Sequence, residues 1–210
     1  MIKIIRKNKR KNPENDIKNF LSNLQPYENI NINNIGKGDF AETYKFHINN
    51  SKILPNNKTL YSGNYLIKRQ LNIKLTISEI KKLQLLSKYG LIPKIYYIDE
   101  RYQIMDYIKS INLFRLLYHH TVSDENRLII FNKIKKLIKN WHNLGFCHGD
   151  LLNLQNYLIT NSYKVYIIDP ATHRECTIQK DLINITEIEE IIKNKHYYWD
   201  EEDTGLYLET

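Results

Sequence analysis

Patterns typical of strands dominate the first half of the chain, and patterns typical of helices dominate the second half. Short β-prone runs separated by turn residues occur at residues 30–48, 65–68, 95–98 and 102–108. Apolar residues instead recur every three or four positions over residues 124–141. An order of strands first and helices later is typical of α+β proteins, so the sequence predicts an α+β fold with two lobes.

Local signals add further elements to this plan. Asn12-Pro13-Glu14 starts a helix that ends before Pro26, and Thr76-Ile77-Ser78-Glu79 is a capping box that opens another helix. Residues 49–64 are rich in turn-forming residues and are expected to form a loop. The remaining expectations are a helix cap at Ser123, a helix end at Gly145, strands at residues 157–159 and 165–168, and a last helix over residues 181–195.

The formal net charge of +8 is unevenly distributed. Residues 1–11 carry six basic side chains and no acid, whereas residues 181–210 carry nine acids against two lysines. The part between them is therefore basic, as expected of a protein with an anionic partner. A nucleotide, a nucleic acid and a membrane surface all fit this description, and the charge does not choose between them.

Length, composition and cysteine content exclude several classes of protein. Hydrophobic residues make up 42% of the 210 residues, which excludes a disordered chain and allows a sizeable core. No apolar run approaches the roughly 18 residues that cross a bilayer, and no apolar segment of a secretory signal follows residues 1–11. Cys147 and Cys176 are too few for a disulfide framework and lack zinc-site spacing. We therefore expect a soluble intracellular protein in a reducing compartment, cytoplasmic by default.

Two elements of the first half have the chemistry of phosphate binding. The run Gly36-Lys37-Gly38-Asp39-Phe40-Ala41 lies between two strands, where glycines let backbone N–H groups approach a phosphate. An ordinary hairpin turn is the alternative. Lys68 ends a strand, and its ammonium group is suited to hold phosphates. A carboxylate would fix the position of this group, and Glu79 is the only acid between Lys68 and Asp99. The alternatives are a solvated strand lysine and a glutamate that serves only the capping box.

Two elements of the second half have the chemistry of phosphoryl transfer. The run from His148 to Asn156 follows the long helix, and its Asp150 is suited to accept the proton of an attacking hydroxyl. Asp169 follows an apolar strand, which would hold a Mg²⁺ ligand rigidly. The alternatives are a polar loop for the first run and a strand-terminating Asp-Pro turn for Asp169.

Together, these four elements resemble the protein-kinase-like fold over residues 30 to about 185, with a β-rich N-lobe and a truncated helical C-lobe. The resemblance implies ATP and Mg²⁺ as nucleotide and cofactor. It assigns catalysis to Asp150, Lys68 and Glu79, and the metal to Asn156 and Asp169. It assigns ATP binding to Ile35, Gly36, Lys37, Gly38, Ala41, Thr43, Lys68, Met105, Asp106 and Ile108, with Met105 as the gatekeeper.

The chain departs from the common kinase pattern at several positions. Asn156 lies six residues after Asp150 where the family has five, and Gln155 occupies the usual place. Asn156 is preferred because it leads directly into the next strand. Gly149 stands where the family has an arginine, so control by activation-loop phosphorylation is not expected. Pro170-Ala171 stands where the family has Phe-Gly, so an aromatic switch is not expected.

The sequence His-Gly-Asp-Leu and the short C-lobe narrow the resemblance to small atypical kinases. These are the RIO-type kinases and the kinase subunit of the KEOPS tRNA-modification assembly; lipopolysaccharide kinases and aminoglycoside phosphotransferases share the motif. In such minimal kinases Asp181 would brace the catalytic loop. A helix N-cap is the equally favoured alternative for Asp181.

The resulting hypothesis is an ATP- and Mg²⁺-dependent phosphotransferase that acts on a protein Ser/Thr hydroxyl. The alternatives are a small-molecule or glycan kinase and a catalytically dead kinase fold that serves as a binding module. Nucleic-acid binding through residues 1–11 is less favoured than a solvated arm. The expected organisation is a basic arm and short helix over residues 1–29, an N-lobe over 30–108, a minimal C-lobe over 109–197 and an acidic tail over 198–210.

Overall fold

The computed structural model describes residues 13–24, 31–38, 40–71, 73–170 and 176–194. The chain divides into two compact units, the first ending at Ile108 and the second beginning at Lys109. The two charged ends predicted from the sequence, the basic residues 1–11 and the acidic tail over residues 198–210, lie outside the described residues. Asp39 and Ala171 lie outside them as well.

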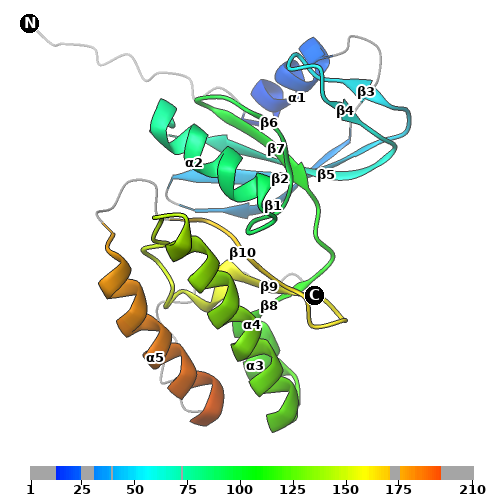
Figure 1. Cartoon of the computed structure of the whole chain (residues 1–210). Helices are drawn as coiled ribbons and strands as arrows, with labels where there is room; N and C mark the ends of the chain where they lie inside the picture. Colours follow the sequence, from blue (N-terminus) through cyan, green and yellow to red (C-terminus); the bar gives the residue numbers. More distant parts are fainter. Residues whose placement is uncertain (1–12, 25–30, 39, 72, 171–175, 195–210) are drawn as a thin grey trace, which may run out of the picture. The chain divides into compact units, whose positions relative to one another are not determined.

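The first unit is built on a five-stranded sheet with the strand order β1-β2-β5-β7-β6 (Figure 1). All neighbouring strands are antiparallel. The strands are β1 (Ile32–Lys37), β2 (Ala41–Ile48), β5 (Gly63–Gln70), β7 (Tyr102–Asp106) and β6 (Ile95–Ile98). The predicted strands and the hairpin of β6 and β7 are thus confirmed, although β5 is longer than expected.

Residues 49–64 are not simply a loop, so that expectation was wrong in part. They contain the short strands β3 (Lys52–Ile53) and β4 (Thr59–Leu60), which pair as a hairpin, and the beginning of β5. Leu54 and Leu60 are each only 2% exposed. Burial of these two leucines anchors the hairpin to the core, a contact that the high content of turn-forming residues conceals.

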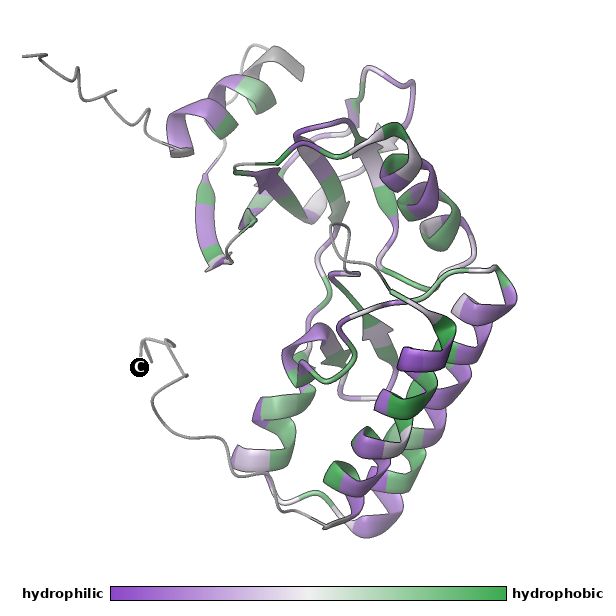
Figure 2. Ribbon diagram, turned by 90° about the vertical axis from the view of Figure 1, so that its left-hand side faces the viewer, coloured by the Kyte–Doolittle hydropathy of each residue, from purple (hydrophilic) through white to green (hydrophobic). Residues whose placement is uncertain are grey.

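Helices α1 (Pro13–Leu24) and α2 (Ile77–Lys88) cover opposite faces of this sheet (Figures 1 and 2). The α1 face buries Ile17 and Leu21 in one cluster with Tyr44 and Phe46 of β2. Since side chains alternate along a strand, the intervening β2 residues face α2. The capping box predicted at the start of α2 is confirmed.

The second unit combines a three-stranded antiparallel sheet with helices. The sheet has the order β10-β9-β8, with β8 (Ile111–Asn112), β9 (Tyr157–Ile159) and β10 (Val165–Ile167). The helices are α3 (Leu113–His119), α4 (Asp124–Asn143) and α5 (Ile178–Asn194), and a 3₁₀ turn, η1, covers Leu154–Asn156. The predicted cap at Ser123 and the strands β9 and β10 are confirmed.

Two helix expectations in this unit need correction. Helix α3 was not predicted, because its seven residues are too few to show a periodic pattern. Its start is instead determined locally, since Oδ1 of Asn112 accepts the N–H of Arg115. Helix α5 begins at Ile178, three residues before the predicted start, and Oγ1 of Thr177 accepts the N–H of Lys180 at this end.

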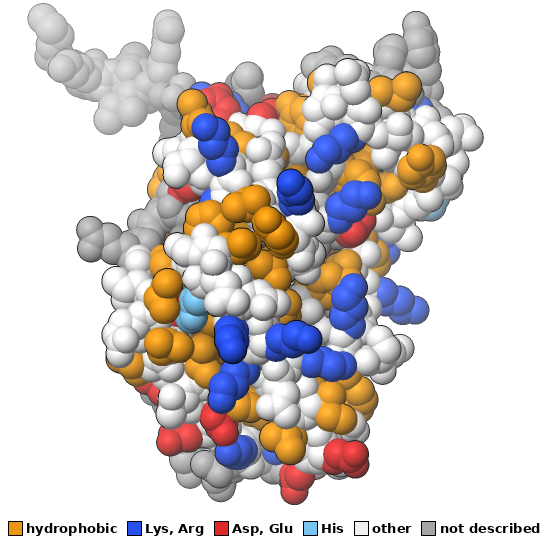
Figure 3. Space-filling view, viewed as in Figure 1, with side chains coloured by type: hydrophobic (Ala, Val, Ile, Leu, Met, Phe, Trp, Pro, Cys, Tyr) orange, Lys and Arg blue, Asp and Glu red, His pale blue; other side chains and the backbone are white. Residues whose placement is uncertain are grey.

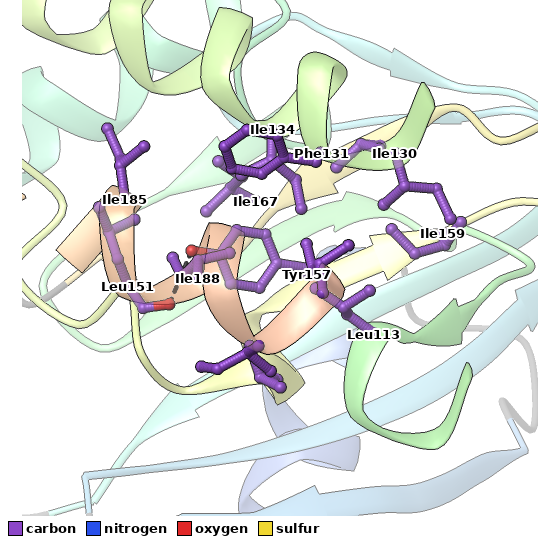
Figure 4. Packing of buried hydrophobic residues seen from close by; sticks show 14 of the residues in the cluster. Leu113, Ile130, Phe131, Ile134, Leu151, Tyr157, Ile159, Ile167, Ile185 and Ile188 are labelled. Atoms are coloured by element: carbon purple, nitrogen blue, oxygen red, sulfur yellow. Dashed lines mark hydrogen bonds between the residues drawn. The ribbon is translucent and has the colours of Figure 1, made fainter. Parts of the chain in front are cut away.

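The core of the second unit lies between α4, α5 and the sheet (Figure 4). Phe131 and Ile134 of α4 and Ile188 of α5 pack around Tyr157, whose side chain is fully buried. The hydroxyl of Tyr157 donates to the carbonyl of Leu151 at 2.7 Å. Burial raises the pKa of Tyr157 well above its usual value, so the hydroxyl remains a donor. This bond fixes the polar segment that precedes η1 to the core.

The outer surface of α4 is basic. Lys135, Lys136 and Lys139 are exposed on this helix, and lysines gather over it in Figure 3. Part of the positive charge expected from the sequence therefore lies on a helix surface. None of the described helices is long and apolar enough to cross a bilayer.

Candidate active site

The glycine run forms the hairpin between β1 and β2. Gly36 and Lys37 lie at the end of β1, and the N–H of Gly38 donates to the carbonyl of Ala41 at 2.9 Å. A Cβ atom added at Gly36 would meet no other atom within 4 Å. Packing inside the protein therefore does not require glycine at this position. An exposed strand end without a side chain is suited to the close approach of a ligand.

Lys68 lies near the middle of the sheet on its α2 face. It pairs with Thr43 of β2 and with Gln103 of β7, and the neighbouring pair joins Leu66 to Met105. Because residues 42, 44 and 46 of β2 face α1, Thr43 and its partners face α2. Lys68 and the predicted gatekeeper Met105 therefore share one face of the sheet, and α2 covers that face.

Glu79 lies in the first turn of α2 and forms the capping box. Its Oε2 accepts the backbone N–H of Thr76 at 2.6 Å and the Thr76 hydroxyl at 2.8 Å. The capping role that was considered for Glu79 is thus confirmed. Its pairing with Lys68 stays a prediction, which the placement of both residues on the same side of the sheet supports.

The segment expected to meet adenine ends the first unit. Asp106 is the last residue of β7, its N–H donates to the carbonyl of Lys94, and its Oδ1 accepts the hydroxyl of Tyr96 at 2.9 Å. Ile108 is the last residue of the unit. Ile35 lies in β1 with half of its side chain exposed.

In the second unit, the structure brings two of the predicted residues into direct contact. The side-chain amide of Asn156 donates from Nδ2 to the backbone carbonyl and to Oδ2 of Asp150, each at 3.0 Å. Asn156 is 5% exposed, whereas Gln155 is exposed and its N–H bonds to Oδ1 of Asn153. Of the two candidates, only Asn156 points to Asp150.

The β9–β10 ladder places Asp169 at the same end as Asn156. Tyr157 pairs with Ile167, and the N–H of Ile168 donates to the carbonyl of Asn156 at 2.8 Å. Asp169 follows directly, with a left-handed φ of 53°. This conformation is uncommon for a residue with a side chain and is often found at functional positions.

His148 holds the loop between α4 and η1 to the end of β10. Its Nε2 lies 2.9 Å from the carbonyl of Ile168, and its Nδ1 lies 3.3 Å from the N–H of Asp150. The carbonyl can only accept and the N–H can only donate, so these contacts assign the neutral form with the proton on Nε2. Burial lowers the pKa of His148, which is only 1% exposed, and thus favours the same neutral form.

Asp181 braces this loop from helix α5. Its fully buried carboxylate accepts the N–H of His148 at 2.7 Å and the N–H of Gly149 at 3.0 Å. Of the two roles considered for Asp181, the brace is confirmed. The N-cap is wrong, because α5 begins at Ile178. Gly149 has a φ of 83°, and this gives a physical reason for glycine where the kinase pattern has arginine.

Two contributors to this region were not found from the sequence. Nε2 of His142, near the end of α4, lies 3.1 Å from Oδ2 of Asp181. Cys147 and Cys176 are joined by a disulfide, with their Cα atoms 5.9 Å apart. A single disulfide is not typical of the reducing compartment that was expected from the sequence. Neither contact has a local signal, because the partners lie 39 and 29 residues apart.

The disulfide closes a ring of the chain from Cys147 to Cys176. This ring contains all three residues that were predicted to take part in phosphoryl transfer: Asp150, Asn156 and Asp169. This order of a braced aspartate, an asparagine bound to it and a strand-ending aspartate is the arrangement expected of a kinase-like catalytic loop. Residues 27–187 match the family model of the RIO domain.

The chain belongs to the RIO family. RIO proteins are atypical protein kinases, so the predicted resemblance and the predicted α+β, kinase-like fold class are confirmed. The match identifies a kinase-like phosphotransferase domain. The match begins after α1 and ends within α5, so helix α1 lies outside the matched residues. No curated protein matches the chain.

Proposed function

We propose that this RIO protein is an ATP- and Mg²⁺-dependent kinase that phosphorylates a serine or threonine hydroxyl of a protein. The observation that supports this most strongly is the contact of Asn156 with Asp150 at the end of the β9–β10 ladder where Asp169 lies. This contact supports the proposal because it holds together two side chains that phosphoryl transfer would use.

Asn156 and Asp169 are the residues that would hold Mg²⁺. Nδ2 of Asn156 donates to Asp150, so Oδ1 is the amide atom suited to a cation. Asp169 supplies a carboxylate, and oxygen ligands of this kind fit Mg²⁺. Among residues with described positions, no group of three or more His, Cys, Asp and Glu side chains could hold a metal ion. The proposed site therefore uses one carboxylate, one amide and the nucleotide phosphates, as Mg²⁺ sites commonly do. Bound Mg²⁺ would neutralise phosphate charge.

Asp150 would orient the acceptor hydroxyl and take its proton. The amide of Asn156 fixes Oδ2 of Asp150, and Asp181 fixes the backbone just before Asp150. Kinase catalysis depends mainly on such positioning and on charge stabilisation. The surrounding network thus restricts Asp150 to the orientation that the reaction needs.

The first unit would bind the nucleotide. The exposed strand end at Gly36 and Gly38 leaves backbone groups open to the phosphates, and Lys68 would neutralise their charge. Since the N–H of Asp106 donates to Lys94, the predicted adenine contact of Asp106 would fall to its carbonyl. The remaining predicted contacts, Ile35, Ala41, Thr43, Met105 and Ile108, are proposed with them.

The length of the second unit favours a protein acceptor. Small-molecule kinases generally build the acceptor pocket from a large helical insert. Only residues 168–177 separate β10 from α5, which is too short for such an insert. A protein acceptor brings its own structure to the reaction and does not need one.

The proposal is tested by transfer of labelled γ-phosphate from ATP to generic protein acceptors in the presence of Mg²⁺. Transfer is expected with the wild-type chain and should be lost in Asp150→Ala. Asp124→Asn is a matched control, because Asp124 is an exposed acid at the start of α4. Phosphoamino-acid analysis should show phosphoserine or phosphothreonine. Equal transfer by Asp150→Ala would contradict the assigned role.

A further inference from the structure

A row of charged residues crosses the sheet of the first unit on its α1 face. Glu42 of β2 pairs with Lys37 of β1 on one side and with Arg69 of β5 on the other. Its side chain is 3% exposed. A buried carboxylate requires hydrogen bonds and opposite charges, so the neighbours of Glu42 are restrained by it.

The contacts of Glu42 form an unbroken chain from helix α1 to the glycine turn. Oε1 of Glu42 lies 3.1 Å from Nζ of Lys37, the residue between the two glycines. Oε2 accepts the hydroxyl of Tyr44 at 3.1 Å and lies 3.5 Å from Nη1 of Arg69. Nη2 of Arg69 lies 2.9 Å from Oδ2 of Asp16 in α1.

Helix α1 is firmly held over this row. Ile17 is fully buried, Leu21 is 3% exposed, and Phe20 stacks on Tyr102 with ring centroids 4.1 Å apart. Tyr102 pairs with Arg69 in the sheet, so the aromatic contact and the ion pair adjoin each other. Because α1 precedes residue 27, the RIO domain match assigns it no role.

The guanidinium group of Arg69 contacts two acids at different distances. The shorter contact of Arg69 is with Asp16, and the longer one is with Glu42. Glu42 therefore depends on Lys37 as its nearer cation. Without Asp16, Arg69 would be free to move closer to Glu42, and the attraction that holds Lys37 would weaken.

We propose that helix α1 acts as a brace for the glycine turn, with Glu42 as a positioning residue. Through Asp16, Arg69 and Glu42, the helix holds Lys37 and the turn in the conformation that binds nucleotide phosphates. This proposal rests on the proposed function of the first unit. The side chain of Lys37 is turned to the α1 face, opposite the face of Lys68. Lys37 thus serves the nucleotide through its backbone, and its ammonium group anchors the turn.

The test compares Asp16→Asn, Glu42→Gln and the conservative variant Asp16→Glu with the wild-type chain. A single partly exposed ion pair affects affinity by about two- to fivefold, so Asp16→Asn should raise the KM for ATP by this factor. The value of kcat should stay within about twofold, because the brace acts on binding. Glu42→Gln should raise the KM at least as much, and Asp16→Glu should retain the wild-type KM. Lys18→Gln, an exposed change on the same helix, is the control.

Hydrogen exchange separates this proposal from the proposed function. The N–H of Gly38 is bonded to the carbonyl of Ala41, so its exchange reports the order of the turn. Asp16→Asn should accelerate exchange at Gly38 and leave Ile168 in the second unit unchanged. Unchanged exchange at Gly38, or an unchanged KM in both Asp16→Asn and Glu42→Gln, would overturn the brace. Faster exchange at Gly38 and weaker ATP binding in a chain that transfers no phosphate would support the brace and overturn the proposed function alone.

Discussion

Reduction of the Cys147–Cys176 disulfide is expected to destabilise the second unit strongly. The bond joins residues 29 positions apart, and the ring contains the sheet strands β9 and β10. Loop-closure entropy for a ring of this size corresponds to about 3.6 kcal/mol of the free energy of unfolding at 25 °C. The reduced chain gains this entropy on unfolding, whereas its folded state keeps the same core contacts.

Urea unfolding followed by tryptophan fluorescence measures this difference. Trp141 of α4 is only 1% exposed, so its fluorescence reports on the unfolding of the second unit, whereas Trp199 lies outside the described residues. With a denaturant slope of about 2 kcal/mol per molar urea, the transition midpoint should fall by about 1.8 M when reductant is added. The midpoint of Cys176→Ser should equal that of the reduced wild-type chain and should not respond to reductant.

Cys147→Ser provides the matched control, because it removes the same bond from the other end. Both serine variants should unfold at the same urea concentration. Equal midpoints for the oxidised and the reduced wild-type chain would refute the reasoning, since the bond would then restrict neither state. A midpoint that still responds to reductant in Cys176→Ser would show that some other group causes the effect.

Three further predictions concern the loop that carries Asp150. Asp181→Asn should cost about 1–3 kcal/mol of unfolding free energy, because it leaves a buried backbone N–H without its charged acceptor. Urea unfolding measures this loss, and hydrogen exchange at the N–H of Gly149 measures the order of the loop. Unchanged exchange would contradict the role of Asp181 as a brace. Burial lowers the pKa of His148 below its ordinary 6.5. Below about pH 6.5 the unfolded chain therefore takes up a proton that the folded chain does not. As the pH falls, the free energy of unfolding should decrease by up to about 1.4 kcal/mol per pH unit. The loss in wild type should exceed that in His148→Gln when unfolding is compared at pH 7.5 and 5.5; equal losses would contradict this. Gly149→Ala should cost about 1–2 kcal/mol because of its left-handed φ, and a neutral result in thermal unfolding would contradict the conformational explanation.

The sequence predicted elements well where the signal is local. The capping box at Thr76, the N-cap at Ser123 and the hairpin of β6 and β7 depend on residues within a few positions of one another. Helix α3 was missed because its seven residues are too few to show a periodic pattern. The β3–β4 hairpin was misread because the burial of Leu54 and Leu60 stabilises it, and the turn-forming residues around them conceal this. The early start of α5 was missed for a different reason: Thr177 caps the helix locally, although the apolar pattern begins later.

The candidate site was predictable to a similar degree. Resemblance to kinases selected Asp150 and preferred Asn156 to Gln155, and the structure shows Asn156 bonded to Asp150. The roles of these residues in catalysis and metal binding remain proposals. The contact between His142 and Asp181 and the bond between the two cysteines were not predictable, because each depends on how α4 and α5 pack.

The same limit explains why the charged row under α1 was missed. Lys37 was expected to contact ATP, and its pairing with Glu42 becomes visible only through the register of β1 against β2. Residues 16 and 69 are 53 positions apart and belong to different elements. Sequence patterns describe which face of an element is apolar, but they do not tell which charges meet across a sheet.

The central claim is tested most directly by the Mg²⁺ dependence of γ-phosphate transfer in wild type and Asp169→Asn. The wild-type chain should transfer labelled phosphate from ATP to a protein acceptor only when Mg²⁺ is present. Asp169→Asn should lose transfer by about a hundredfold or more while its thermal unfolding stays unchanged, because the carboxylate that holds the metal is gone. Transfer by Asp169→Asn at the wild-type rate, or wild-type transfer without a divalent cation, would contradict the account.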